Sequence, residues 1–553
     1  RNVLYIVVGI VTFIGLITSL VTSYRATNYD DGESQASGIR QRPTRLKTWF
    51  RRKFLLPALF GRKHVQPLGY YQFPTRGQTL MVVGYVLLNI VFLATDFPGD
   101  GRTIKTLSDR AGHLAVVNMP LYFLFAGRNN ILIWVTSWPQ RDFQVFHKWI
   151  ARVSTLEAII HSAGYGYVAA QGREYTLESA LEATVVVSAM LLFSVMSARK
   201  HCYELFLAVH ILCAILFLVF LYHHLKDMPH HYTIYVGICS GIWALDRVLR
   251  VARLVITNKN GKHTARARII PHTSTILLAV YPNIEDVGFA PGAHYFLYFP
   301  DKWCFWESHP FTALSWRPTG PNLTRAPPKP HKGIQKMRIV TTSSARRGPQ
   351  RAKLTFLIHP RKGMTRDLLN RLQASPHQSL DMPVLLEGPY GIARPVQAFP
   401  TVVIIAGGVG ISTALPYLQQ QMSPNRGEIT RRFLLIWSVR DGIMAQKILA
   451  SINSLGLSFR SDVELKLFIT RAKDGDVFRF PIGVKVRYRR PKIERTILRE
   501  ARSRIPGTPM AVVACGGAAV VDCARKGAVM ALKKAAGRRG MGEIVYWEEG
   551  YGW

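Results

Sequence analysis

Two stretches of the chain begin and end in histidine: HKWIARVSTLEAIIH at residues 147–161 and HILCAILFLVFLYHH at residues 210–224. Within each stretch the two terminal histidines are fourteen positions apart. In an α-helix that spacing falls about 40° short of four full turns and rises about 21 Å. Each stretch therefore predicts a helix that carries two histidines on one face, one above the other.

Both stretches belong to a series of apolar segments in the first half of the chain. Each segment is long enough to cross a hydrocarbon core of about 30 Å, which takes about 20 helical residues. The seven predicted spans are residues 2–22, 80–96, 113–136, 147–169, 177–196, 203–224 and 232–254. The first span is also compatible with a signal peptide, but a basic segment follows it rather than a cleavage site of small residues.

Charge in the connecting loops predicts the orientation of these spans. The first, third and fifth loops carry fourteen Lys and Arg residues, and the alternate loops carry five. Basic loops stay in the cytoplasm, so the N-terminus is expected outside and everything after residue 254 inside. We therefore expect an integral membrane protein, with the plasma membrane as its location.

Composition narrows the classes of partner. The chain has 71 Lys and Arg against 33 Asp and Glu, a formal net charge of +38, and 48% of its residues are hydrophobic. This hydrophobic fraction excludes a disordered chain. The basic residues are spread over membrane loops and tail without an aromatic-interleaved strip, so we expect membrane lipid rather than nucleic acid as partner. Six cysteines without a CxxC pair predict neither a zinc site nor a disulfide framework.

Ionisable side chains inside a membrane are costly and indicate function. One crossing separates the two helices, so they run in the same direction, and His147 is expected at the depth of His210 and His161 at that of His224. Two such pairs predict two haem groups, each with two axial histidines. His223 is rotated about 140° from the face of His210, which makes His224 the better ligand. For any single histidine, an interfacial hydrogen-bonding role is the alternative.

A deep arginine lies in the third span, within the sequence Ala126-Gly-Arg-Asn-Asn130. Arg128 could pair with a haem propionate there. It could equally be a helix-end arginine whose side chain reaches the cytoplasmic interface.

The pattern changes in the cytoplasmic part. Short strands broken by Pro and Gly, from about residue 264 to 391, predict a small antiparallel barrel. From residue 400 onward, apolar strands alternate with helical stretches, which is typical of a parallel sheet. The predicted domains are 1–254, 255–396 and 397–553, with a basic, Pro-rich insertion at 318–351.

Three segments in the barrel region carry a resemblance to a family: residues 291–294, 296–300 and His309-Pro-Phe-Thr-Ala-Leu-Ser315. The last is similar to the HPF[ST] flavin motif of the ferric reductase and NADPH oxidase superfamily. The resemblance covers most of the chain. It implies a membrane α-helical bundle of about seven spans with two haem b groups. A cytoplasmic ferredoxin-reductase-like module would follow, with an antiparallel β-barrel FAD domain and an α/β NADPH domain.

The same resemblance assigns residues to the flavin. His309, Pro310, Phe311 and Thr312 would line the isoalloxazine and ribityl groups of FAD. The segment from Lys362 through Gly363 to Thr365 is similar to the pyrophosphate loop of the family, where free N–H groups at a helix start suit a phosphate. A glycine before a helix is also common without any ligand.

A glycine-rich turn follows the first apolar strand after residue 400, in Val402-Val-Ile-Ile-Ala-Gly-Gly-Val-Gly-Ile-Ser412. Such a turn lets the pyrophosphate of a dinucleotide approach the backbone at a helix N-terminus, although any α/β domain can contain one. The predicted cofactor residues of this turn are Gly407, Gly408, Gly410, Ile411 and Ser412.

Three further positions complete the expected site. Arg440, after the next strand, suits the 2′-phosphate of NADPH, with a solvated surface arginine as the alternative. By resemblance, Cys515 and Gly516 form the family's CG motif beside the nicotinamide; otherwise Cys515 is a buried small apolar residue. Also by resemblance, Tyr551 or Trp553 would stack on the flavin.

Together these features predict electron transfer from cytoplasmic NADPH through FAD, the haem of His147 and His210, and the haem of His161 and His224. Fungal metalloreductases look closest, which implies reduction of external Fe(III) chelates, or of Cu(II), in support of an iron permease or oxidase. Two alternatives stay open. One is an oxidase that makes superoxide, and the other is a metal transporter with a flavin-fold tail as regulator.

Overall fold

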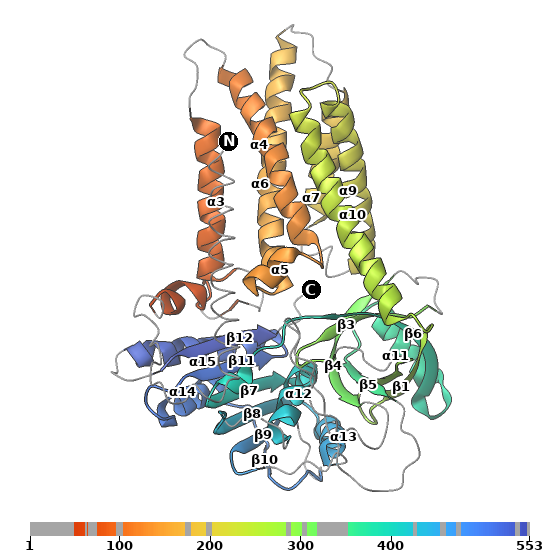
Figure 1. Cartoon of the computed structure of the whole chain (residues 1–553), viewed down its shortest axis with the longest axis vertical. Helices are drawn as coiled ribbons and strands as arrows, with labels where there is room; N and C mark the ends of the chain where they lie inside the picture. Colours follow the sequence, from red (N-terminus) through yellow and green to blue (C-terminus); the bar gives the residue numbers. More distant parts are fainter. Residues whose placement is uncertain are drawn as a thin grey trace. The chain divides into compact units, whose positions relative to one another are not determined.

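The computed structural model divides into two compact units, Arg1–Val21 with Pro67–Val251 and Thr22–Gln66 with Ala252–Trp553 (Figure 1). Each unit is described by itself. The predicted span at 2–22, the insertion at 318–351 and the C-terminal aromatic residues lie outside the described residues. The structure describes residues 49–60, 63–64, 74–95, 103–171, 178–194, 202–283, 289–300, 307–317, 352–423, 429–453, 460–471, 477–536 and 542–549.

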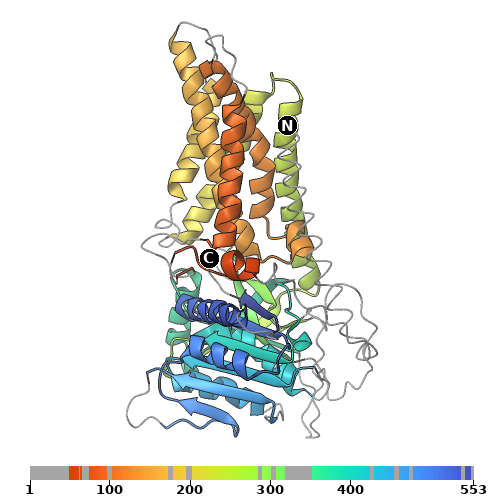
Figure 2. The same ribbon diagram turned by 90° about the vertical axis from the view of Figure 1, so that its left-hand side faces the viewer.

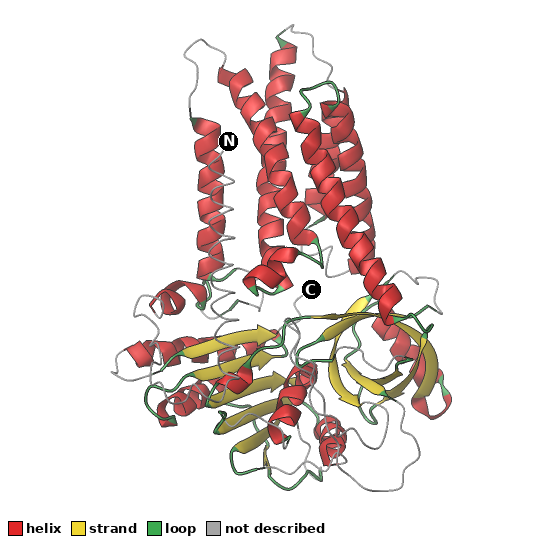
Figure 3. Ribbon diagram, in the orientation of Figure 1, coloured by secondary structure: helices red, strands yellow, loops and turns green. Residues whose placement is uncertain are grey.

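The described residues of the first unit form helices joined by short turns (Figure 2, Figure 3). They are α3 (Arg76–Ala94), α4 (Thr103–Ala126), α5 (Ile131–Thr136), α6 (Gln140–Ala170), α7 (Glu178–Phe193), α9 (Tyr203–Leu225) and α10 (His231–Thr257), whose last turns belong to the second unit. Among the described residues, α3 and α9 are long and apolar enough to span a membrane, and α7 contains a shorter apolar stretch. Seven spans remain a prediction.

The expected single helix over 113–136 is wrong, because α4 ends at Ala126. A turn follows, and the side chain of Asn130 accepts a hydrogen bond of 2.9 Å from the backbone of Leu132 to cap α5. From α10, the carboxylate of Asp246 accepts a 2.9 Å bond from the backbone N–H of Asn129. This contact between distant parts of the chain holds the turn between α4 and α5.

Six antiparallel strands of the second unit close into a barrel, in the order β1-β2-β5-β4-β3-β6. They are β1 (His263–Ile269), β2 (Ile276–Tyr281), β3 (His294–Tyr298), β4 (His309–Arg317), β5 (Lys353–Ile358) and β6 (Ser379–Tyr390). Inward side chains such as Ala265, Leu278 and Leu354 are fully buried. Helix α11 (Met364–Ala374) packs on this core through Leu368 and Leu372. The predicted antiparallel barrel is confirmed.

The following strands form a parallel sheet in the order β10-β9-β8-β7-β11-β12. They are β7 (Thr401–Gly407), β8 (Arg432–Val439), β9 (Val463–Ile469), β10 (Val484–Arg487), β11 (Met510–Cys515) and β12 (Ile544–Glu549). One face packs against α12 (Ile411–Met422) and α13 (Gly442–Asn453), the other against α14 (Ile493–Ser503) and α15 (Ala518–Ala536) (Figure 1). The strand order reverses between β7 and β11, and ligands of such sheets bind at the carboxyl ends of the strands there.

Barrel and sheet share one hydrophobic cluster. Leu314 of β4 and Leu357 of β5 are buried in the same cluster as Leu415 and Leu418 of α12. Burial of this apolar surface brings the strand with the predicted flavin motif against the helix that follows the glycine-rich turn.

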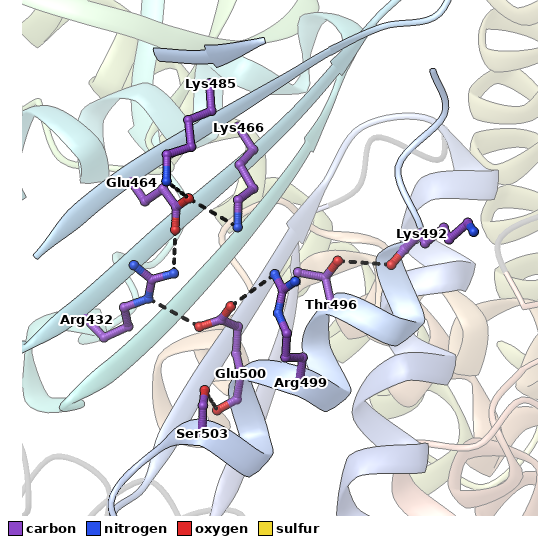
Figure 4. Close-up of polar contacts among 9 residues, drawn as sticks. All are labelled: Arg432, Glu464, Lys466, Lys485, Lys492, Thr496, Arg499, Glu500 and Ser503. Atoms are coloured by element: carbon purple, nitrogen blue, oxygen red, sulfur yellow. Dashed lines mark hydrogen bonds and ion pairs between the residues drawn. The ribbon is translucent and has the colours of Figure 1, made fainter. Parts of the chain in front are cut away.

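A charged network occupies the opposite, amino ends of the strands (Figure 4). Arg432 at the start of β8 bridges two carboxylates, that of the partly exposed Glu464 and that of the buried Glu500. Glu464 also accepts 2.9 Å and 3.2 Å contacts from Lys485 and Lys466. Burial raises the pKa of Glu464, but bonds from Lys485 and Arg432 outweigh it and lower that pKa to about 2.

Candidate functional site

The four predicted haem ligands form two close pairs between α6 and α9. The ring centres of His147 and His210 are 6.4 Å apart, and those of His161 and His224 are 6.1 Å apart. A metal ion bonded to two imidazole nitrogens at about 2 Å leaves the ring centres about 6 Å apart. Both pairs therefore fit a metal held between two imidazoles.

Backbone carbonyl groups orient the two histidines of α6. Nδ1 of His147 lies 2.8 Å from the carbonyl oxygen of Tyr122, and Nδ1 of His161 lies 2.8 Å from that of Ser108. A carbonyl only accepts, so each Nδ1 carries the proton and donates it. The other ring nitrogen, Nε2, is then left with the lone pair that a metal needs.

Two glycines let α4 and α6 approach closely enough for these bonds. A Cβ on Gly112 of α4 would lie 2.4 Å from Nδ1 of His161, and a Cβ on Gly164 of α6 would lie 1.8 Å from Oγ of Ser108. Any larger residue would push the helices apart. Neither glycine was recognised from the sequence, because the signal depends on which helices are neighbours.

Arg128 lies half-buried in the turn between α4 and α5. The adjacent Asn129 is held by Asp246, which also accepts a 2.6 Å bond from Arg247. Asp246 is a residue that sequence reasoning overlooked. The signal was an acidic residue in an otherwise apolar and basic span.

The flavin motif occupies the start of β4, at the edge shared with β3. Phe311 and Thr312 pair with Tyr295 and His294 of β3, and His309 and Pro310 pair further along the same strand. Thr312 is 4% exposed, and its hydroxyl has no hydrogen-bond partner among the described residues. A buried hydroxyl without a partner is costly, so this position fits a polar group of a bound flavin.

The predicted pyrophosphate loop precedes α11. Gly363 has a positive φ of 70°, and the hydroxyl of Thr365 accepts a 2.9 Å bond from the backbone of Arg361. Lys362 is exposed at this point. The loop is therefore shaped by a glycine-dependent turn with cations beside it.

Positive charges from this loop and from the end of β8 act on the same histidine. The pKa of His359 is lowered by burial and by the positive charges of Arg361, Arg440 and Arg366. Because all three arginines act on one residue, the cations of the barrel and of the sheet gather in one region. Such a region attracts the phosphates of both expected cofactors.

The glycine-rich turn meets the CG motif at the reversal point of the sheet. Cys515 pairs with Ala406 at the ends of β11 and β7. A Cβ on Gly410 would lie 2.7 Å from the carbonyl carbon of Cys515, and one on Gly516, which has a φ of +128°, would lie 2.6 Å from the oxygen of Gly407. Only glycine permits this approach.

Two predicted residues follow directly on this turn. Ile411 is fully buried at the start of α12, and Ser412 is 3% exposed with a hydroxyl that has no hydrogen-bond partner among the described residues. Gly408 has a positive φ of 54° and open space where a side chain would be. The turn thus fits a phosphate ligand at the helix start.

A carboxylate lies beside Cys515 that sequence reasoning did not assign. Burial and the charge of Glu549 raise the pKa of Cys515. Glu549 forms a 3.0 Å ion pair with Arg394, whose backbone N–H donates to the hydroxyl of Tyr417 at 3.0 Å. The signal was present in the two consecutive glutamates before the C-terminus. Tyr551 and Trp553 lie outside the described residues.

A second arginine accompanies Arg440. The backbone N–H of Arg471, after β9, donates to the carbonyl oxygen of Arg440 at 3.1 Å, and both side chains are exposed. The two guanidinium groups thus follow neighbouring strands at the carboxyl edge of the sheet. Sequence reasoning assigned only Arg440, because strand adjacency was unknown.

Family models match both parts of the chain. The model of a ferric reductase like transmembrane component matches residues 111–221, and that of an FAD-binding domain matches residues 259–323. The matched regions contain three of the four paired histidines, His147, His161 and His210, and also the flavin motif.

Similar proteins come from yeasts. Ferric reductase transmembrane component 3 of Saccharomyces cerevisiae is 28% identical over 389 residues, which is 66% of this chain and 49% of that protein. Ferric/cupric reductase transmembrane component 1 of Candida albicans is 26% identical over 457 residues, 77% of this chain and 53% of that protein. The chain spans about half the length of these curated relatives.

Among solved structures, a ferredoxin NADP+ reductase from Neisseria gonorrhoeae with bound FAD and NADP is 16% identical with a TM-score of 0.32. The match covers 52% of this chain and 97% of that one.

Proposed function

Because the chain belongs to the ferric reductase and NADPH oxidase superfamily, we propose that it carries electrons from cytoplasmic NADPH to an acceptor outside. The acceptor would be Fe(III) chelates, with Cu(II) as a second metal. The two histidine pairs of α6 and α9, with ring centres 6.4 Å and 6.1 Å apart, carry this proposal. Their spacing and orientation suit two haem b groups at different depths.

When bound, FAD would supply the conversion of an electron pair into single electrons, and the haems would supply one-electron transfer. The chain binds and orients them. His147 and His210 would hold the inner haem, and His161 and His224 the outer one. Tyr122 and Ser108 keep the α6 imidazoles in the ligating tautomer.

In the second unit, His309, Pro310, Phe311 and Thr312 would line the flavin, and Lys362, Gly363 and Thr365 its pyrophosphate. The turn from Gly407 to Ser412 would receive the pyrophosphate of NADPH. Arg440, with Arg471, would select the 2′-phosphate. These assignments are supported by the buried hydroxyls and the close backbone approach at Gly410.

Cys515, Gly516 and Glu549 would surround the nicotinamide. The buried Cys515 provides a small, uncharged wall, since its raised pKa keeps the thiol protonated at neutral pH. Tyr551 or Trp553 would cover the flavin until nicotinamide replaces it.

We further propose the predicted domain organisation, 1–254, 255–396 and 397–553, in the plasma membrane with the N-terminus outside. An iron permease or oxidase would use the reduced metal.

The test uses the full-length protein in membranes, given NADPH with a ferric chelate or with oxygen alone. We expect two low-spin haem equivalents and Fe(II) formation that superoxide dismutase does not abolish. His161→Ala should abolish outer-face iron reduction while NADPH still reduces the flavin. His223→Ala is the control, because His223 is exposed on α9 directly beside the predicted ligand His224.

Other outcomes would redirect the proposal. Iron reduction that depends wholly on superoxide would identify an oxidase. A protein without haem absorbance that moves metal across the membrane would identify a transporter.

A further inference from the structure

Residues 49–56 of the chain dock on the outer face of the parallel sheet. They include a short π-helix, Arg51–Leu55, which is the red-orange coil beside α15 in Figure 1. Leu56 is 9% exposed and belongs to the hydrophobic cluster of the α14 and α15 face. Arg51 forms an ion pair with Glu543, directly before β12. A segment that precedes the first described membrane helix is thus part of the nucleotide-binding layer.

Arg525 of α15 connects this segment to β12. It is 6% exposed, its Nη1 donates to the carbonyl oxygen of Leu56 at 3.0 Å, and its Nη2 donates to Glu548. The guanidinium also lies 5.2 Å from the ring centre of Tyr546. A charge buried to this extent requires such partners, so the three contacts hold the side chain in one place.

Glu548 and the next residue are held from opposite faces of the sheet. Successive side chains of a strand point to opposite sides. Glu548 accordingly meets Arg525 on the α15 side, while Glu549 meets Arg394 at 3.0 Å on the other side. Glu549 is also the carboxylate that acts on the pKa of Cys515. The end of β12 is therefore clamped by two arginines beside the proposed nicotinamide site.

We infer that Arg525 is a positioning residue, through which docking of residues 49–56 sets the place of Glu549 at the nucleotide site. The order of contacts is Leu56, Arg525, Glu548 and then Glu549. Loss of the docked segment would let the end of β12 move and misplace the groups around Cys515. This inference rests on the proposed function, since it concerns hydride transfer from NADPH.

The experiment measures flavin reduction by NADPH in the full-length protein, by stopped-flow absorbance. We expect Arg525→Gln to slow flavin reduction about tenfold at saturating NADPH. The apparent Kd for NADPH and the FAD and haem contents should stay near their wild-type values. Such a split between rate and affinity is the sign of misplacement rather than of lost binding.

Arg504→Gln is the matched control. Arg504 donates to the carbonyl oxygens of Glu543 and Gly542, at the other end of β12 and away from Cys515. A purely structural role of Arg525 predicts that both variants lower the thermal midpoint and the rate alike. Equal effects of the two variants would overturn the inference, as would an unchanged rate in Arg525→Gln.

Removal of Arg525 alone leaves the carboxylate of Glu548 buried without its partner, and the chain could then fail to fold. The double variant Arg525→Gln with Glu548→Gln removes both charges, and Leu56→Ala weakens docking without touching either. We expect both to retain FAD and to reduce it slowly, and wild-type rates in both would contradict the inference. If NADPH does not reduce the flavin of the wild-type protein, the proposed function fails instead.

Discussion

Ser108 on α4 and His161 on α6 are joined by a 2.8 Å hydrogen bond from the imidazole Nδ1 to the backbone carbonyl oxygen. The bond depends on close contact between the two helices, which Gly112 permits. Orientation of His161, the proposed ligand of the outer haem, therefore depends on a residue that carries no functional group.

Gly112→Ala should prevent binding of one of the two proposed haems. The new Cβ would lie 2.4 Å from Nδ1 of His161, so the ring must turn away from His224. We expect the haem content of the purified protein to fall by about half, measured by absorbance. Gly166→Ala on α6 is the control, because nothing lies within 4 Å of its Cβ. Full haem content in Gly112→Ala would count against the outer pair.

Thr312→Val should affect the free and FAD-bound protein differently. The buried hydroxyl has no partner among the described residues, so its removal should leave the FAD-free protein as stable or slightly more stable. One hydrogen bond to FAD is worth about 1 kcal/mol, so FAD affinity should fall about fivefold. Fluorescence titration with FAD measures this effect. Thr355→Val, buried on β5, should leave the affinity unchanged.

Arg471→Gln should lower the preference for NADPH over NADH. A hydrogen bond between a guanidinium and a phosphate contributes about 1.5–3 kcal/mol, so kcat/KM for NADPH should fall about 10- to 100-fold. The value for NADH should change little. Arg431→Gln is the control, because Arg431 is exposed next to the amino end of β8. An equal loss with both coenzymes would show that Arg471 does not contact the 2′-phosphate.

Glu464→Gln should change how stability depends on acidity. The folded-state pKa of Glu464 is about 2, below its ordinary value of 4.5, so its ionised form stabilises the fold at neutral pH. That stabilisation is lost as pH falls from about 4.5 to 2, because the unfolded chain binds the proton first. After allowance for solvent screening, we expect ionised Glu464 to contribute about 1 kcal/mol to the free energy of unfolding.

The measurement is the thermal midpoint of the full-length protein at pH 7 and pH 3. We expect a smaller difference between the two midpoints in Glu464→Gln than in wild type. Glu494→Gln, which removes a surface pair with Lys526, should retain the wild-type difference. An unchanged difference in Glu464→Gln would contradict the role of this network.

Local patterns predicted much of this fold. The spacing of fourteen placed His147 and His161 on one face, and helix geometry then determined which partner each could meet. Runs broken by Pro and Gly predicted the barrel strands, and the glycines after β7 predicted the turn that meets Cys515. Each of these inferences uses residues that are close in sequence or the regular repeat of a helix.

Contacts between distant residues could not be predicted in this way. Asp246 bonds to Asn129 in the turn that follows α4. Hydropathy alone predicts that this helix continues through the turn. The sequence alone places Leu56 in a basic loop. Its contact with Arg525, 469 positions away, depends on the fold. The proximity of Arg471 to Arg440 and of Glu549 to Cys515 likewise depends on the order of the strands in the sheet.

The cluster that joins Leu314 to Leu415 and Leu418 limits how this chain can be divided. A fragment cut between barrel and sheet would expose apolar surface on both pieces, and each would tend to aggregate. Chimeras between relatives should therefore exchange residues 263–549 as one block. For the same reason, evolutionary changes in coenzyme preference and in flavin binding must both preserve this shared hydrophobic cluster.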